Sequence, residues 1–407
     1  MNREQVAGRG RKMSVTQTIY LDYNATTPVD PRVVEAILPY FNQRYGNASS
    51  RHHEYGWEAK EAVEKARQQV SGLIGALPQQ LIWTSGATES NNLAIKGVAA
   101  KQQHKGRHII TAMHEHEAVL NPCNRLEKQG YEVTRLKPAR DGVVRANQVA
   151  EAISDQTILI SIMWANNEIG TINQIPQIAR ICRQRGVIFH SDATQMLGKM
   201  PVNVREIGVD LLSASAHKFY GPKGVGFLYV RDLGDDASRV PFAPQVEGGG
   251  HEHDLRAGTL NVPGIVGLGV TAEICQREQA GDASRLVGMR QKLEAGISEQ
   301  IEGVTLNGHA TERLPNTANI RFAGVETEAL MVAVPGLAIS FGAACTGTIK
   351  GSHVLAALGN DENQLSSSIR FSLGRFTRNE DVDKAIEQVA AAVRRLRNSA
   401  TGLKTPS

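Results

Sequence analysis

The chain has 407 residues, of which 41% are hydrophobic and 21% are charged, with 39 glycines and 15 prolines. This composition is typical of soluble globular proteins, and the length exceeds what one hydrophobic core usually organises, so we expect two domains. The 45 Lys and Arg residues nearly balance the 41 Asp and Glu residues, and the net charge of +4 argues against a dedicated nucleic-acid-binding surface. No stretch approaches the roughly 18 apolar residues of a membrane-spanning helix.

The first residues, MNREQVAGRGRKMS, are basic and have no apolar segment like that of a secretory signal. We expect residues 1–18 to form a disordered tail. The four cysteines, Cys123, Cys182, Cys275 and Cys345, lie far apart, and no pair has the spacing of metal ligands. Since a chain of this size needs no disulfide scaffold, we expect free thiols and a cytoplasmic protein.

The N-terminal third begins with a short predicted strand and turn in TIYLDYNATTP. In DPRVVEAILPYFNQRYG, Asp30 precedes Pro31 and apolar residues recur at helical spacing, which predicts a helix. Residues 58–75 have the pattern of an amphipathic helix that ends at a glycine.

Strands and helices then alternate. Apolar strands are predicted at 80–86, 107–113, 131–138, 157–165, 186–193, 209–216 and 224–231. Helices are predicted at 87–100, 116–130 and 175–186. Continuous apolar strands alternating with helices indicate a mainly parallel sheet that is covered on both faces.

From about Gly267 the pattern changes. A long polar helical region covers roughly 270–302, shorter elements follow to residue 374, and a final helix lies near 379–398. This order suggests a smaller α+β domain. We therefore expect a large domain over 28–269 and a small domain over 19–27 and 270–407.

Ligands of open α/β sheets bind beyond the carboxyl ends of the strands, where this chain carries distinctive residues. In WTSGATES, Ala87 and Thr88 open a helix, whose N-terminus favours a phosphate, although such a turn taken alone is more often a simple helix cap. In VIFHSDATQ, Asp192 ends an apolar strand and Gln195 follows. A buried carboxylate needs a partner, which a protonated ring nitrogen or a backbone N–H could supply.

The segment LSASAHKFYGPKG places His217 and Lys218 at the end of another apolar strand. A partly desolvated lysine has a lowered pKa and attacks aldehydes, and Ser215 and His217 could donate to a phosphate. A lone lysine could also simply neutralise the loop. The sequence GPKGVG lacks the Gly-Lys-Ser/Thr of a phosphate-binding P-loop.

Two His-x-His pairs suggest zinc: His114 with His116, and His251 with His253. Neither pair has further ligands at a characteristic spacing, so we expect no metal site. A histidine such as His116 can instead cover an aromatic ring. A phosphate site, an acid for a ring nitrogen, a lysine for an aldehyde and a histidine over a ring together are what pyridoxal 5′-phosphate (PLP) requires.

Seven ordered motifs carry a resemblance to a known family: YLDYNATTPVDPRV, TSGATESNNLAIKG, ANNEIGT, HSDATQ, SASAHKFYGPKGVG, RAGTLNVPGIVGLG and SSIRFSLGRFT. From about Tyr20 to about Arg397 the chain resembles the cysteine desulfurases of the NifS/IscS type. The resemblance implies fold type I of the PLP enzymes, like aspartate aminotransferase, with a mainly parallel seven-stranded sheet. It also implies a homodimer that converts L-cysteine to L-alanine.

The resemblance assigns roles to particular residues. Lys218 matches the lysine that binds PLP, and Asp192 matches the partner of the ring nitrogen. His116 matches the residue stacked on the ring, and Gln195 matches the partner of the ring oxygen. Asn167 matches a polar residue that contacts both cofactor and substrate. Phosphate contacts match Ala87, Thr88, Ser215 and His217, with Thr259 reaching the phosphate of the other subunit. Arg370 matches the arginine that binds the substrate carboxylate in a planar, two-pronged pair.

Cys345 matches the catalytic cysteine, which collects sulfur as a persulfide. Its neighbours Gly342, Ala343, Ala344 and Gly347 favour a flexible loop, although Phe341 and Ala343 depart from the Ser-rich sequence usual there. We expect the other three cysteines to be buried and to act as small hydrophobic side chains. Since few free thiols are ionised at neutral pH, His116 is expected to accept the thiol proton.

The sulfur acceptor stays open. Iron–sulfur scaffold proteins, thio-cofactor synthesis and nucleic-acid sulfur modification are alternatives, and Cys345 could ligate an iron–sulfur cluster transiently. The end of the chain, RRLRNSATGLKTPS, is shorter than the tail with which housekeeping members engage a scaffold protein. Rival hypotheses are a selenocysteine lyase or another PLP lyase of this fold, a non-catalytic scaffold, and nucleic-acid binding by the basic N-terminus.

Overall fold

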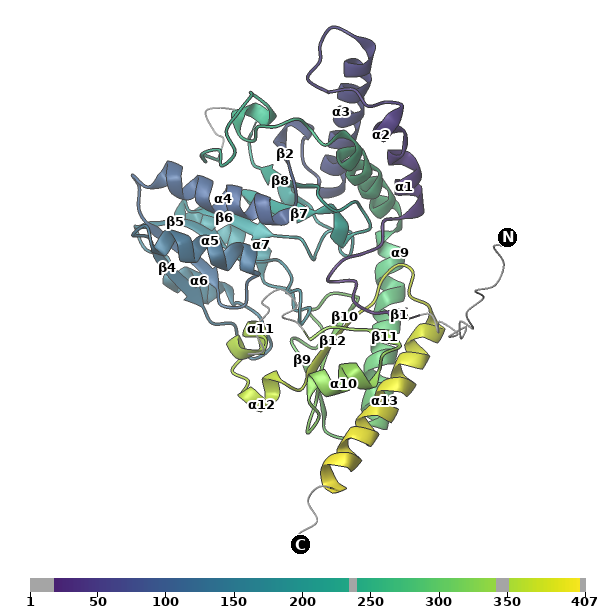
Figure 1. The fold of residues 1–407 in the computed structure, drawn as a ribbon. Coiled ribbons are helices and arrows are strands. Elements are labelled where there is room, and N and C mark those ends of the chain that lie inside the picture. The colour runs from purple at the N-terminus through teal and green to yellow at the C-terminus, as the bar shows by residue number, and fades with distance from the viewer. Residues whose placement is uncertain (1–17, 234–239, 342–350, 403–407) are drawn as a thin grey trace, which may run out of the picture.

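The structure is a computed structural model that describes residues 18–233, 240–341 and 351–402. The expected N-terminal tail and Cys345 with its loop neighbours from Gly342 onward lie outside these residues. Figure 1 shows an upper α/β part built on a large sheet, a lower part with smaller sheets, and one long helix, α9, that runs through both.

The large sheet has seven strands in the order β2-β8-β7-β6-β5-β3-β4. The strands are β2 (Leu81–Thr84), β3 (His108–Ala112), β4 (Glu132–Leu136), β5 (Thr157–Ser161), β6 (Ile188–Asp192), β7 (Leu211–Ser215) and β8 (Gly226–Val230). Only β8 runs antiparallel to its neighbours, β2 and β7. The mainly parallel seven-stranded sheet predicted from the sequence is confirmed.

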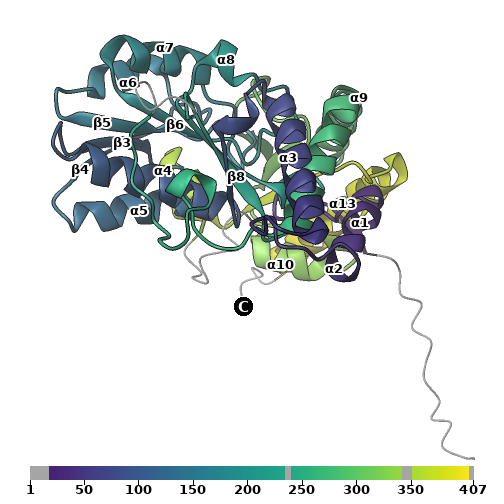
Figure 2. The ribbon, with the colours of Figure 1, turned by 90° about the horizontal axis from the view of Figure 1, so that it is seen from above.

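Helices cover both faces of this sheet. They are α4 (Ala87–Gln102), α5 (Glu117–Glu127), α6 (Ala146–Ala152), α7 (Ile175–Arg185) and α8 (Val204–Ile207). Figure 2 shows α6, α7 and α8 on one face and α4 and α5 on the other. Every residue of β2, β3, β5, β7 and β8 is consequently buried, whereas the edge strand β4 is partly exposed, which explains their continuous apolar sequences.

The N-terminal helices α1 (Pro31–Ile37), α2 (Pro39–Asn42) and α3 (Glu54–Ile74) lie beside the first half of α9 (Val262–Gln300). As expected, Asp30 caps α1 by accepting a hydrogen bond from the Arg32 backbone N–H. Helix α3 begins before the predicted residue 58, because the His53 side chain accepts from the Gly56 N–H and caps it there. It ends at Gly75, whose φ of 68° favours glycine.

The smaller part contains a three-stranded antiparallel sheet and a two-stranded parallel sheet. The first has the order β12-β10-β9, from β9 (Val304–Asn307), β10 (Thr317–Phe322) and β12 (Ser368–Ser372). The second pairs β1 (Ile19–Tyr20) with β11 (Leu337–Ala338). Its helices are α10 (Thr327–Ala333), α11 (His353–Ala357), α12 (Glu362–Leu365) and α13 (Asn379–Gly402).

Helix α9 joins two hydrophobic cores. Ile265 and Leu268 near its start belong to the core beneath the large sheet, whereas Leu293 and Ile297 belong to a core with Phe371 of the small sheet. The helix begins at Val262, earlier than the predicted residue 270, because the Asn261 side chain accepts from the Gly264 N–H. The boundary expected at 269/270 falls inside this one helix, and the division into domains stays a prediction.

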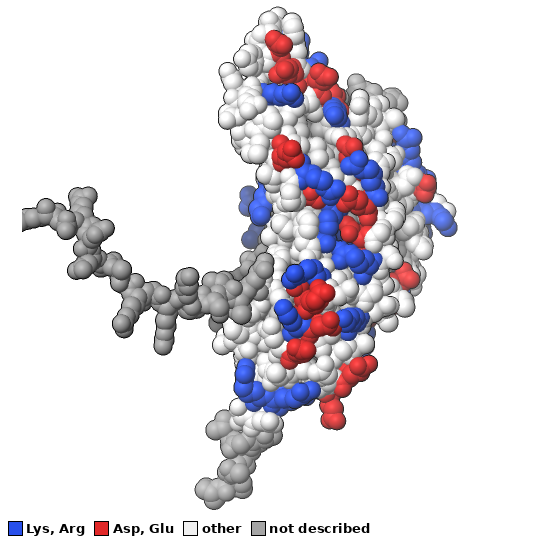
Figure 3. All heavy atoms as spheres, turned by 90° about the vertical axis from the view of Figure 1, so that its right-hand side faces the viewer, with Lys and Arg blue, Asp and Glu red and all other residues white. Residues whose placement is uncertain are grey.

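The face formed by α1, α9 and α13 carries charges of both signs. Figure 3 shows Lys and Arg interspersed with Asp and Glu there. Ion pairs link the helices: Arg32 with Glu278 at 2.6 Å, and Lys292 with Asp383 at 2.6 Å. Exposed pairs of this kind contribute little to stability. Within the three described ranges, no helix has both the length and the apolar character needed to span a membrane.

Candidate active site

A cavity of about 530 Å³ lies at the carboxyl ends of β6 and β7. We call it the central cavity. Of the residues predicted from the sequence, it is lined by Ala87, Thr88, His116, Asn167, Asp192, Gln195, Ser215, His217, Lys218 and Arg370. Thr259 is exposed and does not line this cavity, and Cys345 lies outside the described residues.

Lys218 lies in a single helical turn, Ala216–Lys218, directly after β7. Its Nζ donates to the backbone carbonyls of Asn24 and Ala25, each at 2.8 Å. These two residues belong to the segment after β1, nearly two hundred residues away in sequence, so a distant part of the chain orients the amine.

Asp192 is the last residue of β6 and is 6% exposed. Its Oδ2 accepts from Asn91 Nδ2 at 2.7 Å, and its Oδ1 accepts from the Thr194 backbone N–H at 2.9 Å. Of the two partners that the sequence suggested, the backbone N–H is present at Oδ1, and the carboxylate also lines the cavity, where a ring nitrogen would have to approach it. Asn91 comes from the first turns of α4, which brings a polar side chain of that helix against the carboxylate.

His116 lines the cavity at the start of α5. Its Nδ1 accepts from the Ala118 N–H at 3.1 Å, which assigns the proton of the neutral ring to Nε2. Burial lowers the pKa of His116; Asp192 opposes this shift, and the positive charge of Lys218 adds to it. The neutral ring in this tautomer presents an N–H donor at Nε2, and it accepts a proton there only after giving that one up.

One side of the central cavity is formed by the N-terminus of α4. Gly86 directly precedes the helix and lies against Gly226 of β8. A Cβ on Gly226 would lie 2.7 Å from the Gly86 Cα, so the two backbones are too close for a side chain at position 226. His217 Nδ1 lies 3.1 Å from Thr26 Oγ1. Burial, reinforced by nearby lysines, lowers the pKa of His217 to about 4, so the ring is neutral at pH 7. The 16-residue helix supplies free N–H groups and a positive dipole end to an anion.

Arg370 reaches the cavity from β12 of the small sheet. Its Nη2 pairs with Asp22 Oδ1 at 2.7 Å, and its Nη1 donates to the Asn167 carbonyl at 3.0 Å. Its Nε is buried and has no partner in the described structure. The guanidinium is therefore held in place by two contacts, while its Nε–H has no acceptor.

Several lining residues were missed from the sequence: Asn24, Ala25, Thr26, Ser85, Gly86, Glu89, Asn91, Ala118, Met163, Ala165, Thr194, Lys223 and Gly224. A signal existed for Asn91, which lies one helical turn after Ala87 and therefore faces the same side. Asn24 lies in the first of the seven family motifs, but no pattern placed it at the cavity, because only the tertiary fold brings the segment after β1 to the sheet.

The remaining candidate ligands lie apart from the cavity. His114 is buried, which lowers its pKa to about 4, and His251 Nε2 lies 3.1 Å from Ser49 Oγ. In the described ranges no group of three His, Cys, Asp or Glu side chains could hold a metal. Cys123, Cys182 and Cys275 are buried as predicted, and burial raises the pKa of each thiol, to about 12 for Cys123 and about 11 for Cys275.

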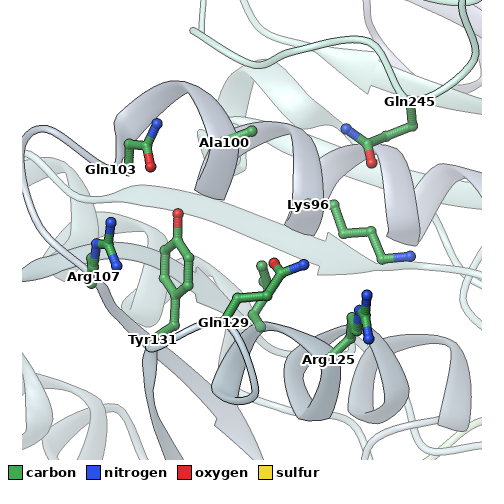
Figure 4. A pocket seen from close by; sticks show the side chains of 9 residues that line it. Lys96, Ala100, Gln103, Arg107, Arg125, Gln129, Tyr131 and Gln245 are labelled. Atoms are coloured by element: carbon green, nitrogen blue, oxygen red, sulfur yellow. The ribbon is translucent and has the colours of Figure 1, made fainter.

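A second hollow of about 380 Å³ lies on the outer side of α4 and α5. Figure 4 shows Lys96, Arg107 and Arg125 around it, together with Tyr131. The Arg107 guanidinium lies 5.6 Å from the Tyr131 ring centroid, and the Tyr131 hydroxyl donates to the Ala99 carbonyl. The hollow shares no residue with the central cavity, and it contains no predicted site residue.

The central cavity fits PLP. Three buried atoms of its lining residues lack partners in the described structure: Asn91 Oδ1, Thr194 Oγ1 and Arg370 Nε. Buried polar atoms are rarely left unpaired, so they indicate a polar ligand. An amine at Lys218, a carboxylate at Asp192 and an anion site at α4 are the groups that an aldehyde, a ring nitrogen and a phosphate need.

Comparisons with known proteins identify the family. The sequence profile described as "Aminotransferase class-V" matches residues 19–385. "Cysteine desulfurase IscS" of Anaeromyxobacter dehalogenans is 51% identical over 380 residues, which is 93% of each chain. A solved "NIFS-LIKE PROTEIN" superimposes with a TM-score of 0.86 at 36% identity, over 93% of this chain and 100% of that one. The structure "SspA in complex with cysteine" has a TM-score of 0.78 at 36% identity, over 89% and 100%.

These similarities extend over nearly the whole chain, and they confirm the family and fold expected from the seven sequence motifs. The confirmed fold is that of the type I PLP enzymes. The chain belongs to the PLP-dependent cysteine desulfurases of the class-V aminotransferase family.

Proposed function

We propose that the chain converts L-cysteine to L-alanine and transfers the sulfur to the thiol of Cys345, which becomes a persulfide. The observation that carries this proposal is the meeting of Lys218, Asp192 and Arg370 in one cavity. The related SspA structure holds cysteine, which supports an amino acid of this size as the substrate.

The chain's own groups would hold PLP at four points. Asp192 would face the ring nitrogen, Gln195 the ring oxygen and His116 the ring itself, while the phosphate would lie at Ser215, His217 and the first turn of α4. When bound, PLP supplies an aldehyde for the amino group and a protonated ring that accepts electrons from the substrate. Thr259, which is exposed here, would reach the phosphate of a second subunit.

Arg370 would bind the substrate carboxylate. Its unpaired Nε and its fixed guanidinium plane suit a carboxylate, for which two parallel N–H donors give a stronger and more directional bond than an ammonium group does. Asn167, whose carbonyl accepts from Arg370, would keep the guanidinium oriented and contact the substrate with its amide.

Lys218 would move the substrate's Cα proton with its Nζ, because the carbonyls of Asn24 and Ala25 already hold this atom at the cavity. His116 would donate from Nε2 to the substrate Cβ once the sulfur has left. The bond at its Nδ1 favours donation over the acceptance of the thiol proton that the sequence suggested.

The transfer of sulfur from the substrate to Cys345 needs no external oxidant. The Cys345 thiolate attacks the substrate sulfur, the S–S bond forms, and the Cβ–S bond breaks with its electron pair left on the substrate carbon. That carbon takes a proton, so cysteine and a thiol give alanine and a persulfide.

The experiment loads the purified protein with PLP, treats it with borohydride and maps the modified residue. A pyridoxyl group on Lys218, with alanine formed from cysteine, supports the proposal. A colourless protein that carries no pyridoxyl group at Lys218 contradicts it and favours a non-catalytic scaffold. Comparing turnover of cysteine with that of selenocysteine separates a desulfurase from a selenocysteine lyase.

The proposed function also requires partner proteins. We infer a cytoplasmic homodimer that hands its persulfide sulfur to an acceptor protein such as an iron–sulfur scaffold. Large apolar side chains are exposed along residues 38–57: Leu38 at 58%, Phe41 at 64%, Tyr45 at 64% and Trp57 at 57%. Because such a concentration of exposed apolar groups marks an interaction surface, it supports contact with a second copy.

A further inference from the structure

Lys199 is a buried lysine beside the central cavity. It lies in the turn after β6, is 9% exposed and is not among the residues that line the cavity. Its Nζ donates to two oxygens of Gln195: the side-chain Oε1 at 2.6 Å and the backbone carbonyl at 3.1 Å. Throughout the described structure, no carboxylate pairs with it.

These bonds decide how the Gln195 carboxamide is turned. Gln195 Nε2 donates to the Asn24 carbonyl at 3.0 Å. If the amide were flipped, Lys199 Nζ would lose the oxygen that now accepts from it, and the amide oxygen would face the Asn24 carbonyl, a repulsive contact whatever the charge of Lys199. Lys199 and Asn24 together therefore allow one orientation only.

The chosen orientation affects the cavity, which Gln195 lines. An amide nitrogen carries two hydrogens, and only one is used by Asn24. The Asn24 carbonyl also accepts from Lys218 Nζ at 2.8 Å. A continuous set of hydrogen bonds thus runs from Lys199 through Gln195 and Asn24 to the lysine at the cavity.

We propose that Lys199 is a positioning residue, which holds the Gln195 amide so that an N–H rather than the carbonyl oxygen faces the ring oxygen of PLP. The inference rests on the proposed function, because it takes Gln195 as the partner of that oxygen. A ring oxygen with negative charge is stabilised by an N–H donor and repelled by a carbonyl.

Stability alone does not explain a lysine at this place. Burial lowers the pKa of Lys199 well below its usual range, and the charges of Lys218 and Arg370 add to this effect. Asp282, which lines the same small hollow as Lys199, is paired with Arg375 at 2.8 Å. An apolar side chain of similar length would avoid the cost of burying the amine, but it would leave the Gln195 amide free to turn.

The test compares Lys199→Met, Gln195→Leu and the double variant as PLP-loaded proteins. Lys199→Met should shift the visible band of bound PLP in the same direction as Gln195→Leu and weaken PLP binding about tenfold. The double variant should change no further than Gln195→Leu alone, because Lys199 acts through Gln195. Lys96→Met, which removes a half-buried amine from the outer side of α4, is the matched control and should leave both measurements unchanged.

Additive changes in the double variant, or an unchanged spectrum and PLP affinity in folded Lys199→Met, would overturn the proposal. If Lys199→Met does not fold, Lys199→Gln takes its place; its shorter amide keeps an N–H donor, so a smaller shift is expected and no shift contradicts the inference. A wild-type protein without any visible band after PLP loading would refute the proposed function instead.

Discussion

The Nη2 atom of Arg370 lies 2.7 Å from the Oδ1 atom of Asp22, and the two side chains are 4% and 20% exposed. The arginine proposed to bind the substrate carboxylate is thus already paired with a carboxylate of the chain. Asp22 follows β1 and Arg370 lies in β12, so the pair also ties the N-terminal segment to the small sheet. If Arg370 binds the substrate as proposed, the substrate carboxylate has to share the guanidinium with Asp22 or displace Asp22 from it.

Asp22→Asn tests this competition. The amide of asparagine keeps an oxygen acceptor for Arg370 but has no negative charge. The positive charge of Arg370 is then no longer neutralised by Asp22 and attracts a substrate carboxylate more strongly. We expect KM for cysteine to fall about threefold to tenfold, equivalent to ~1 kcal/mol, with little change in kcat. Steady-state kinetics with cysteine measure both constants, and a raised KM would show that Asp22 serves mainly to position Arg370.

Arg370→Lys should raise KM for cysteine. An ammonium group cannot donate to Asn167, to Asp22 and to the substrate in one plane, and the loss of a two-pronged charged pair costs about 2 kcal/mol, or roughly thirtyfold. The control is Arg378→Lys, which alters an exposed arginine paired with Asp381 and should leave KM unchanged. Equal effects of the two substitutions would count against a substrate contact at Arg370.

Asn91→Leu removes the donor to Asp192 Oδ2, which lies 2.7 Å away. A buried carboxylate that loses one hydrogen bond is less well oriented, and the cost is about 1–3 kcal/mol. We expect PLP affinity and kcat/KM each to fall at least tenfold. Asn92→Leu, one position along α4, removes only a bond to the Thr88 carbonyl and is the comparison; similar losses in both variants would assign the effect to the helix rather than to Asp192.

Stability should fall as the pH is lowered from 7 to 5. Burial lowers the pKa of His114 and His190 to about 4, whereas an unfolded histidine titrates near pH 6.5. Between these values the unfolded chain binds more protons, so the free energy of unfolding declines with falling pH by ~1–2 kcal/mol for each histidine. Chemical denaturation at the two pH values measures this.

His190→Asn isolates one contribution to this pH dependence. In the wild-type protein the ring bonds Ser161 and Ser213 at 2.8 Å and 2.9 Å. The variant should be less stable at pH 7 yet lose less stability on acidification. An undiminished slope would show that His190 titrates normally in the folded protein.

The apolar surface along residues 38–57 should hold the dimer together. Replacing both Phe41 and Tyr45 with serine removes aromatic side chains worth about 1.5–3 kcal/mol each when buried, so the double variant should sediment as a monomer at concentrations where the wild type is dimeric. Val332→Ser is the control, because Val332 is 81% exposed on α10. A wild-type protein that sediments as a monomer would contradict the proposed homodimer.

Much of the site was predictable because it lies at strand ends. Asp192 and Lys218 each follow an uninterrupted apolar strand, and parallel strands place their carboxyl ends at one edge of a sheet. The start of α9 was harder to predict, since its first turns are glycine-rich and are stabilised by packing against α3 and by the Asn261 cap. Asn24 and Asp22 belong to a motif of the family, but their contacts with Lys218 and Arg370 could not be predicted, because these partners are hundreds of residues away in the sequence.

The sequence by itself determined the family, the alternating α/β order and the chemical groups of the site, since these depend on local pattern and on residue type. Only the tertiary structure decided which groups face one another: that Asp22 pairs with Arg370, that Asn91 supports Asp192, and that Lys199 turns the Gln195 amide. Hydrogen bonds and ion pairs require contact within a few ångströms, and contacts between distant segments are set by how sheets and helices pack rather than by spacing along the chain.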